Sequence, residues 1–142
     1  MNQYQSLMDI IVKVDRSWSN HVREIALSEG VPDSYRTVLL ILHRNPGIGQ
    51  RAVSDRFGVT PSAINQVVKT MMADGYLLKE IDESDKRNSR LYLTGKGIRV
   101  AEKIRARLDA DLEMIVKHIG PKNVSVVTRS LEQIFNFMQR ND

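Results

Sequence analysis

The residues best suited to chemistry follow Thr60, where polar side chains recur on one side of a predicted helix. Thr60 is a favourable N-cap, because its hydroxyl can accept a hydrogen bond from a free backbone N–H, and Pro61 suits the first helical position. Four polar residues face away from the apolar stripe of this helix: Ser62, Asn65, Gln66 and Lys69. Asparagine and glutamine can pair with adenine, and lysine can reach guanine or a phosphate, so this face suits the major groove of DNA.

A second polar group lies between two predicted strands, 76–81 and 89–93. Lys86, Arg87 and Arg90 surround the tip of this segment, and Asp85 can orient Arg87 through a charge-assisted pair. A guanidinium on a narrow loop can enter the minor groove of DNA, where A·T-rich sequence concentrates negative potential. The alternative for both groups is a solvated polar surface, and for the loop the acidic residues Asp82, Glu83 and Asp85 lend that alternative some weight.

Three short motifs extend this pattern: Asp85-Lys86-Arg87, then Leu91-Tyr92-Leu93-Thr94-Gly95-Lys96-Gly97, and upstream Val59-Thr60-Pro61-Ser62-Ala63-Ile64 with Leu77. Their order and spacing resemble the MarR family of winged helix-turn-helix transcription regulators. The resemblance implies a dimer with interlocked terminal helices, a recognition helix that begins at Thr60, and Arg87 in the minor groove. It also implies repression that a small aromatic or anionic effector relieves. The first helix of the motif differs, because it reads Arg51-Ala52-Val53-Ser54 where the family usually has a Leu-Ala pair.

Hydrophobic periodicity predicts the helices that must position these residues. Apolar residues at steps of three and four begin at Leu7, and Gly30 and Pro32 end this first helix. A second helix is expected to start at an Asp33 or Ser34 cap. Its predicted buried face consists of Tyr35, Val38, Leu39 and Leu42.

The segment 49–75 predicts two short helices joined by a tight turn, which is a helix-turn-helix. The first helix carries Ala52, Val53 and Phe57 inward and stops at Gly58. The second helix has a longer predicted buried face: Ile64, Val67, Val68, Met71 and Met72. Gly75 suits the left-handed residue after the end of that helix.

Two amphipathic helices follow the predicted hairpin. Thr94 is expected to cap a long helix that ends at Gly120-Pro121, and a last helix completes the chain. Their apolar stripes need burial, and a second copy of the chain is the simplest partner. The predicted fold is therefore mainly α with a small β-hairpin wing. We expect one compact fold with an N-terminal dimerisation helix (1–32), a winged helix-turn-helix (33–97) and C-terminal dimerisation helices (98–142).

Composition excludes several classes of function. The 142 residues contain no cysteine, which rules out disulfides and thiolate metal sites, and the net charge of +4 favours polyanionic partners. We find no nucleotide-binding loop, nucleophile elbow or metalloprotease motif, so no enzyme activity, catalytic residue or cofactor is predicted. The scattered histidines predict no metal site. No apolar run is long enough for a membrane span, and we expect a cytoplasmic protein without a signal peptide.

Two sets of candidate residues follow. The predicted DNA-contacting set is Gln50, Arg51, Thr60, Pro61, Ser62, Asn65, Gln66, Lys69, Asp85, Lys86, Arg87 and Arg90. The predicted effector pocket is Trp18, His21, Tyr35, Arg36 and His43, with core or dimer packing as the alternative. We expect a homodimer on a pseudo-palindromic double-stranded operator. The alternatives are a winged helix that binds protein, and a scaffold that only buffers a small molecule or serves as an orphan enzyme.

Overall fold

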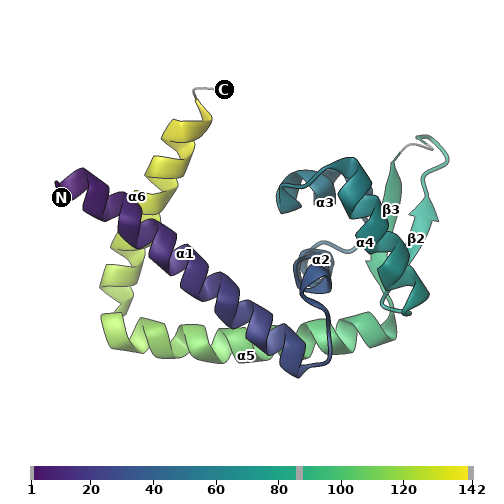
Figure 1. The fold of residues 1–142 in the computed structure, drawn as a ribbon, viewed down its shortest axis with the longest axis horizontal. Helices are drawn as coiled ribbons and strands as arrows, with labels where there is room; N and C mark the ends of the chain where they lie inside the picture. Colours follow the sequence, from purple (N-terminus) through teal and green to yellow (C-terminus); the bar gives the residue numbers. More distant parts are fainter. Residues whose placement is uncertain (1, 86–87, 141–142) are drawn as a thin grey trace. The chain divides into compact units, whose positions relative to one another are not determined.

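A computed structural model describes residues 2–85 and 88–140. Within these ranges the chain forms six helices and three short strands (Figure 1). Their order is α1 (Gln3–Ser28), α2 (Asp33–Arg44), β1 (Ile48–Gly49), α3 (Gln50–Phe57), α4 (Pro61–Ala73), β2 (Leu77–Ile81), β3 (Ser89–Leu93), α5 (Gly95–Ile119) and α6 (Pro121–Gln139). This mainly helical fold with a small antiparallel sheet confirms the predicted fold class. Lys86 and Arg87 lie outside the described residues.

The chain divides into two compact units, one up to Ala106 and one from Arg107. The first unit contains α1 to α4, the three strands and the start of α5, and it holds nearly all of the buried apolar residues. In the second unit, α6 has no buried residue. None of the helices in the described part of the chain is long and apolar enough to cross a membrane. The division into dimerisation and DNA-binding regions stays a prediction.

Local signals placed the ends of the two central helices. Thr60 caps α4, since its Oγ1 accepts a hydrogen bond from the Ala63 backbone N–H at 3.1 Å. Gly58 ends α3 with a φ of 73°, in the left-handed region that glycine adopts without strain. The predicted cap of α2 was wrong, because Pro32 is the N-cap and no side chain caps this helix. The Asp33 carboxylate instead accepts a hydrogen bond from Arg36 Nε at 2.6 Å.

The buried faces of the central helices are narrower than their periodicity predicts. In α4, Ile64, Val68 and Met71 are buried, whereas Val67 is only half-buried and Met72 is 41% exposed. In α3, Val53 is buried, but of the other predicted core residues Ala52 is exposed and Phe57 is half-buried. Each helix packs through one side only, so about one residue per turn reaches the core. The four predicted core residues of α2 are all buried.

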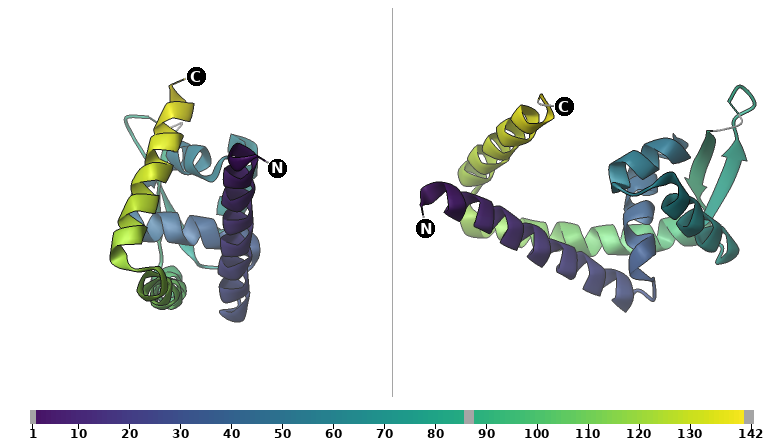
Figure 2. Two further views of the ribbon diagram at one scale, coloured as in Figure 1. Left: turned by 90° about the vertical axis from the view of Figure 1, so that its left-hand side faces the viewer. Right: turned by 45° about the horizontal axis from the view of Figure 1, so that its top comes forward.

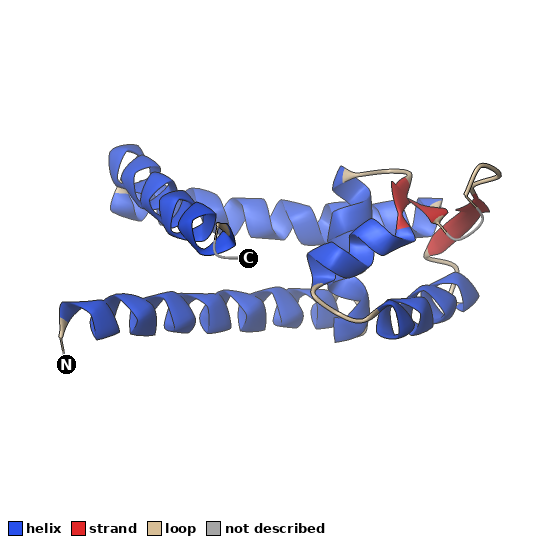
Figure 3. Ribbon diagram, turned by 90° about the horizontal axis from the view of Figure 1, so that it is seen from above, coloured by secondary structure: helices blue, strands red, loops and turns tan. Residues whose placement is uncertain are grey.

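The sheet has one more strand than the sequence predicts. Its order is β1-β3-β2, and both pairs are antiparallel. β1 pairs Ile48 with Leu91 and Gly49 with Arg90, directly before α3 begins. Two residues cannot show the alternation that reveals a longer strand, which is why sequence reasoning missed β1. Figure 3 shows the strands in red next to the central helices, and Figure 2 shows the β2–β3 hairpin beside α4.

Residues 74–76 at the end of α4 and residues 94–97 at the start of α5 form a dense set of contacts, which we call the α4–α5 junction. Thr94 donates through its backbone N–H to the Tyr76 carbonyl at 3.0 Å and through its hydroxyl to the Gly75 carbonyl at 2.6 Å. Lys96 Nζ donates to the Asp74 carbonyl at 2.8 Å and lies 4.4 Å from the centre of the Tyr76 ring. The junction therefore satisfies carbonyls that a helix end leaves free.

Gly97 permits this close approach. A Cβ at position 97 would lie 2.2 Å from the Tyr76 carbonyl oxygen, a backbone atom that cannot rotate away. A Cβ at Gly95 would meet only the flexible guanidinium of Arg99, at 3.3 Å. Of the two glycines in the Gly95-Lys96-Gly97 motif, only Gly97 is required for the close backbone contact of the junction.

We predict that Gly97→Ala lowers the free energy of unfolding by at least about 2 kcal/mol, because the backbones of the junction must separate to admit a methyl group. Gly95→Ala is the matched control and should change it by less than about 0.5 kcal/mol, since alanine also favours helix. Urea unfolding followed by circular dichroism, at one protein concentration, measures both values. Equal effects of the two substitutions would contradict the steric role of Gly97.

Candidate nucleic-acid interface

The polar face predicted on α4 is largely exposed in the structure. Ser62, Gln66 and Lys69 are exposed, and Asn65 is half-buried. Thr60 and Pro61, which begin the helix, are also exposed, and Thr60 has a capping role whether or not it meets DNA. Because Ile64, Val68 and Met71 occupy the opposite side, the helix is anchored without using its polar face.

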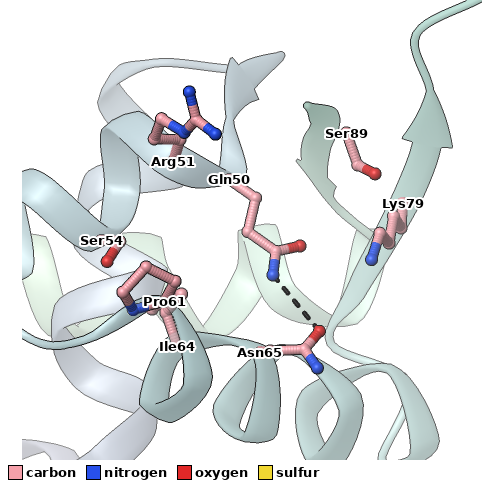
Figure 4. A pocket seen from close by; sticks show the side chains of 8 residues that line it. All are labelled: Gln50, Arg51, Ser54, Pro61, Ile64, Asn65, Lys79 and Ser89. Atoms are coloured by element: carbon pink, nitrogen blue, oxygen red, sulfur yellow. Dashed lines mark hydrogen bonds between the residues drawn. The ribbon is translucent and has the colours of Figure 1, made fainter. Parts of the chain in front are cut away.

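A cavity of about 270 Å³ lies between α3, α4 and the sheet (Figure 4). Its lining includes several predicted DNA-contacting residues: Gln50, Arg51, Pro61 and Asn65. Gln50 Nε2 donates to Asn65 Oδ1 at 3.4 Å, whereas Gln50 Oε1 is buried without a hydrogen-bond partner among the described residues. Lys79 of β2 and Ser89 of β3 also line the cavity, and sequence reasoning did not single them out.

The base of the predicted wing is an ordered turn. The Ser84 hydroxyl and the Ser84 backbone N–H both donate to Asp82 Oδ1, at 2.6 Å and 3.0 Å, and these bonds lower the pKa of the Asp82 carboxyl. The Asn88 backbone N–H donates to the Asp85 carbonyl at 3.0 Å. Arg90 is exposed on β3 opposite Glu80 of β2. Lys86 and Arg87 of the predicted set fall outside the described residues, so their roles stay predictions.

The predicted effector residues lie in several different surroundings. Trp18 and Arg36 line a second cavity of about 270 Å³ between α1, α2, α3 and α5, together with three arginines that sequence reasoning did not group with them: Arg44, Arg56 and Arg105. His21 does not line this cavity, although its ring lies 5.8 Å from that of Trp18. His43 Nε2 lies 3.8 Å from Glu102 Oε1 on another side of α2. None of the described residues forms a cluster that could hold a metal ion.

Tyr35 also lies outside this cavity and connects α2 to the α4–α5 junction. It is buried, and its hydroxyl donates to Asp74 Oδ2 at 2.5 Å. Its ring packs edge-on against Tyr76, with 5.6 Å between the ring centres. Burial, and next the hydrogen bond to Asp74, raise the pKa of the Tyr35 hydroxyl. Tyr35 thus joins the helix that lines the second cavity to the helix that carries the polar face.

The fold and the exposed polar helix define a winged helix-turn-helix protein. The sequence model of the MarR family matches residues 29–88, which include α2, α3, α4 and β2. The chain is 23% identical over 103 residues to the HTH-type transcriptional regulator PetP of Rhodobacter capsulatus. That alignment covers 72% of this chain and 62% of PetP, so the chain spans less than two thirds of this curated relative.

Solved structures show the same fold along nearly the whole chain. A MarR transcriptional regulator from Methanosarcina mazei superposes with a TM-score of 0.82 at 20% identity, covering 97% of this chain and 99% of that one. Streptococcus pneumoniae FabT, solved in complex with DNA, superposes with a TM-score of 0.80 at 18% identity, covering 99% and 100%. Residues 29–88 thus match the MarR family, and the fold of the chain is that of a solved MarR transcriptional regulator.

We predict that Tyr35→Phe lowers the free energy of unfolding by about 1 kcal/mol near neutral pH, because the hydrogen bond to Asp74 is lost. Tyr35 ionises at higher pH when folded than its ordinary pKa of 10.0. Its contribution is therefore complete below pH 10.0 and is lost as the pH rises through the raised pKa of the folded chain. The stability difference between the parent and Tyr35→Phe should shrink accordingly.

Chemical unfolding at a series of pH values measures this difference. Tyr4→Phe is the matched control, since Tyr4 is 70% exposed and its removal should leave stability unchanged at every pH. A difference between the parent and Tyr35→Phe that stays constant to pH values well above 10.0 would contradict a buried, hydrogen-bonded hydroxyl at position 35.

Proposed function

We propose that this protein is a sequence-specific double-stranded DNA-binding transcription regulator that acts in the cytoplasm as a homodimer. The observation that carries the proposal is the free polar face of α4 beside the β2–β3 hairpin, within a fold that a DNA-bound protein also adopts. A helix of this size fits the major groove, and a hairpin beside such a helix can follow the phosphate backbone as a wing.

The residues divide by the part of DNA that they suit. Ser62, Asn65 and Gln66 have donors and acceptors for base edges, and they lie on the free face of α4. Arg51 and Lys69 are exposed cations suited to phosphates, which fix orientation without reading sequence. Lys86 is proposed to contact a phosphate as well, and the family resemblance implies that Arg87 enters the minor groove.

Exposed apolar side chains support a dimer. The second unit exposes many of them: Leu112, Met114, Ile115, Ile119, Val126, Val127, Leu131, Phe135, Phe137 and Met138. In the first unit, the N-terminal half of α1 exposes Leu7, Ile10 and Val14. Exposed apolar surface of this extent usually marks an interface, and a second copy of the chain brings a matching surface. Two copies would place two α4 helices about 34 Å apart, one duplex turn, and so occlude a promoter as a repressor.

The cavity lined by Trp18 supports a small-molecule effector. Four arginines line it, none of its described lining residues is acidic, and Val22, Leu40 and Ile41 add apolar surface. Guanidinium groups pair with carboxylates, and an indole ring offers a face for stacking. A small aromatic anion matches this chemistry, and its binding would release the operator.

We predict that the protein binds its operator as two chains per duplex, with an affinity that falls about a thousandfold between 50 and 200 mM salt if about six phosphates are contacted. Footprinting upstream of its own reading frame locates the operator. Sedimentation of the protein with that labelled duplex, at several salt concentrations, then measures affinity and stoichiometry together.

Arg87→Ala should weaken this binding by about 1 to 3 kcal/mol without altering the dimer. Arg107→Ala, a change of equal charge outside the proposed interface, is the control and should leave the affinity unchanged. A flat salt dependence would favour a winged helix that binds protein. A monomer at the concentrations that protect DNA would contradict the proposed assembly.

For the effector, we predict that aromatic carboxylates such as phenylacetate quench the fluorescence of Trp18, the single tryptophan of the chain, in a saturable way. Arg44→Ala should weaken this binding at least about tenfold, because it removes a charge-assisted contact. Arg99→Ala, on α5 outside the cavity, is the matched control. Quenching that never saturates, or equal losses in both variants, would exclude this cavity as the effector site.

A further inference from the structure

The hydrogen bond between Gln50 and Asn65 joins the first residue of α3 to the middle of α4 (Figure 4). Gln50 donates through Nε2 to Asn65 Oδ1 at 3.4 Å. In this arrangement the amide oxygen of Asn65 points toward Gln50 and its amide nitrogen points away (Figure 4). Of the four polar residues proposed to face DNA from α4, only Asn65 forms a side-chain hydrogen bond with another helix among the described residues.

The orientation of an asparagine amide decides what it can read. One end donates two hydrogen bonds, and the other end accepts them. An unrestrained asparagine can turn either end outward, so it offers both patterns. With Oδ1 engaged by Gln50, Asn65 offers its NH₂ group as a donor, while the second lone pair of Oδ1 remains available.

Two features of the fold restrain Gln50 in turn. Its backbone follows Gly49 of β1, which lies against the Asn88 side chain: a Cβ at position 49 would lie 2.6 Å from Asn88 Oδ1. Its Oε1 is buried and points to the side of the cavity that Lys79 and Ser89 line, both of which carry donor groups (Figure 4). The oxygen of Gln50 is thus enclosed on that side, and its nitrogen is the end that meets Asn65.

We propose that Gln50 is a positioning residue that sets the base preference of Asn65. The inference rests on the proposed function, and it assigns to Gln50 an effect through Asn65 in place of a contact of its own. In the major groove, adenine, guanine and thymine each present an acceptor, whereas cytosine presents only its N4 amino donor. A donor held outward by Gln50 therefore disfavours cytosine at the base that Asn65 reads.

Gln50→Glu tests this mechanism because a carboxylate accepts hydrogen bonds and cannot donate them. Asn65 must then turn its NH₂ group toward position 50 and its oxygen outward. The penalty against cytosine should fall at least about fivefold at that one base position. Gln50→Met keeps a similar shape without any donor or acceptor amide, so the discrimination should weaken without turning toward cytosine.

The experiment is selection from a randomised duplex library by the full-length chain, followed by sequencing of the bound fraction. Asn65→Ala identifies the base position that Asn65 reads, because the base preference at that position should disappear in this variant. Gln66→Glu is the charge-matched control on the neighbouring residue, and it should lower overall affinity without relieving the penalty against cytosine there. Thermal unfolding of each variant verifies that it is folded.

The outcomes separate the two proposals. If the parent enriches no sequence, the proposed function and this inference both fail. If the parent enriches a site and Asn65→Ala erases one preference, but Gln50→Glu leaves that preference intact, only the role of Gln50 is overturned. If Gln50→Glu alters the base preferences equally at all positions of the site, the inference is also overturned. A localised relief of the cytosine penalty supports it.

Discussion

The α4–α5 junction is the contact on which the orientation of the proposed recognition helix depends. A helix of 13 residues has too little internal stability to hold its direction alone, so its ends must be fixed by their neighbours. Thr94 and Lys96 satisfy the carbonyls of Gly75 and Asp74, and Gly97 allows the backbones to meet. Thr60 caps the other end. The polar face of α4 is therefore not needed to anchor the helix, and of its four polar residues only Asn65 bonds through its side chain to another helix among the described residues.

The two sides of α2 connect this junction to the arginine-lined cavity. Tyr35 donates to Asp74 at the end of α4, while Arg36 and Arg44 line the cavity. In the proposed function, an anion that draws the arginines together would move the same helix that holds Asp74. A ligand shifts the equilibrium between two conformations only if its contacts differ between them. The helix α2 contributes both the arginines that would bind the ligand and the tyrosine that bonds to the end of α4. The proposed release of the operator therefore needs no long chain of intermediate residues.

The difference between predicted and observed sites follows from helix geometry. Tyr35 and Arg36 are neighbours in sequence, but successive residues of a helix point about 100° apart. They consequently reach the core and the cavity respectively, although sequence reasoning placed them in one pocket. The Gln50–Asn65 hydrogen bond spans 15 positions, and no local rule relates residues at that separation. Asp33 was taken for a cap, yet the arginine one turn later competes for its carboxylate.

The sequence by itself determined the order of the helices, the cap at Thr60 and the stop at Gly58, because each cap or stop depends on residues within four or five positions of one another. It also determined the hairpin, because two apolar segments flank one short polar loop. It also determined which side of α4 is polar. Only the tertiary structure decided that Gln50 meets Asn65, that Arg56 and Arg105 join Trp18, and that β1 pairs with β3. These contacts join different helices and strands, and their geometry is set by how the whole core packs.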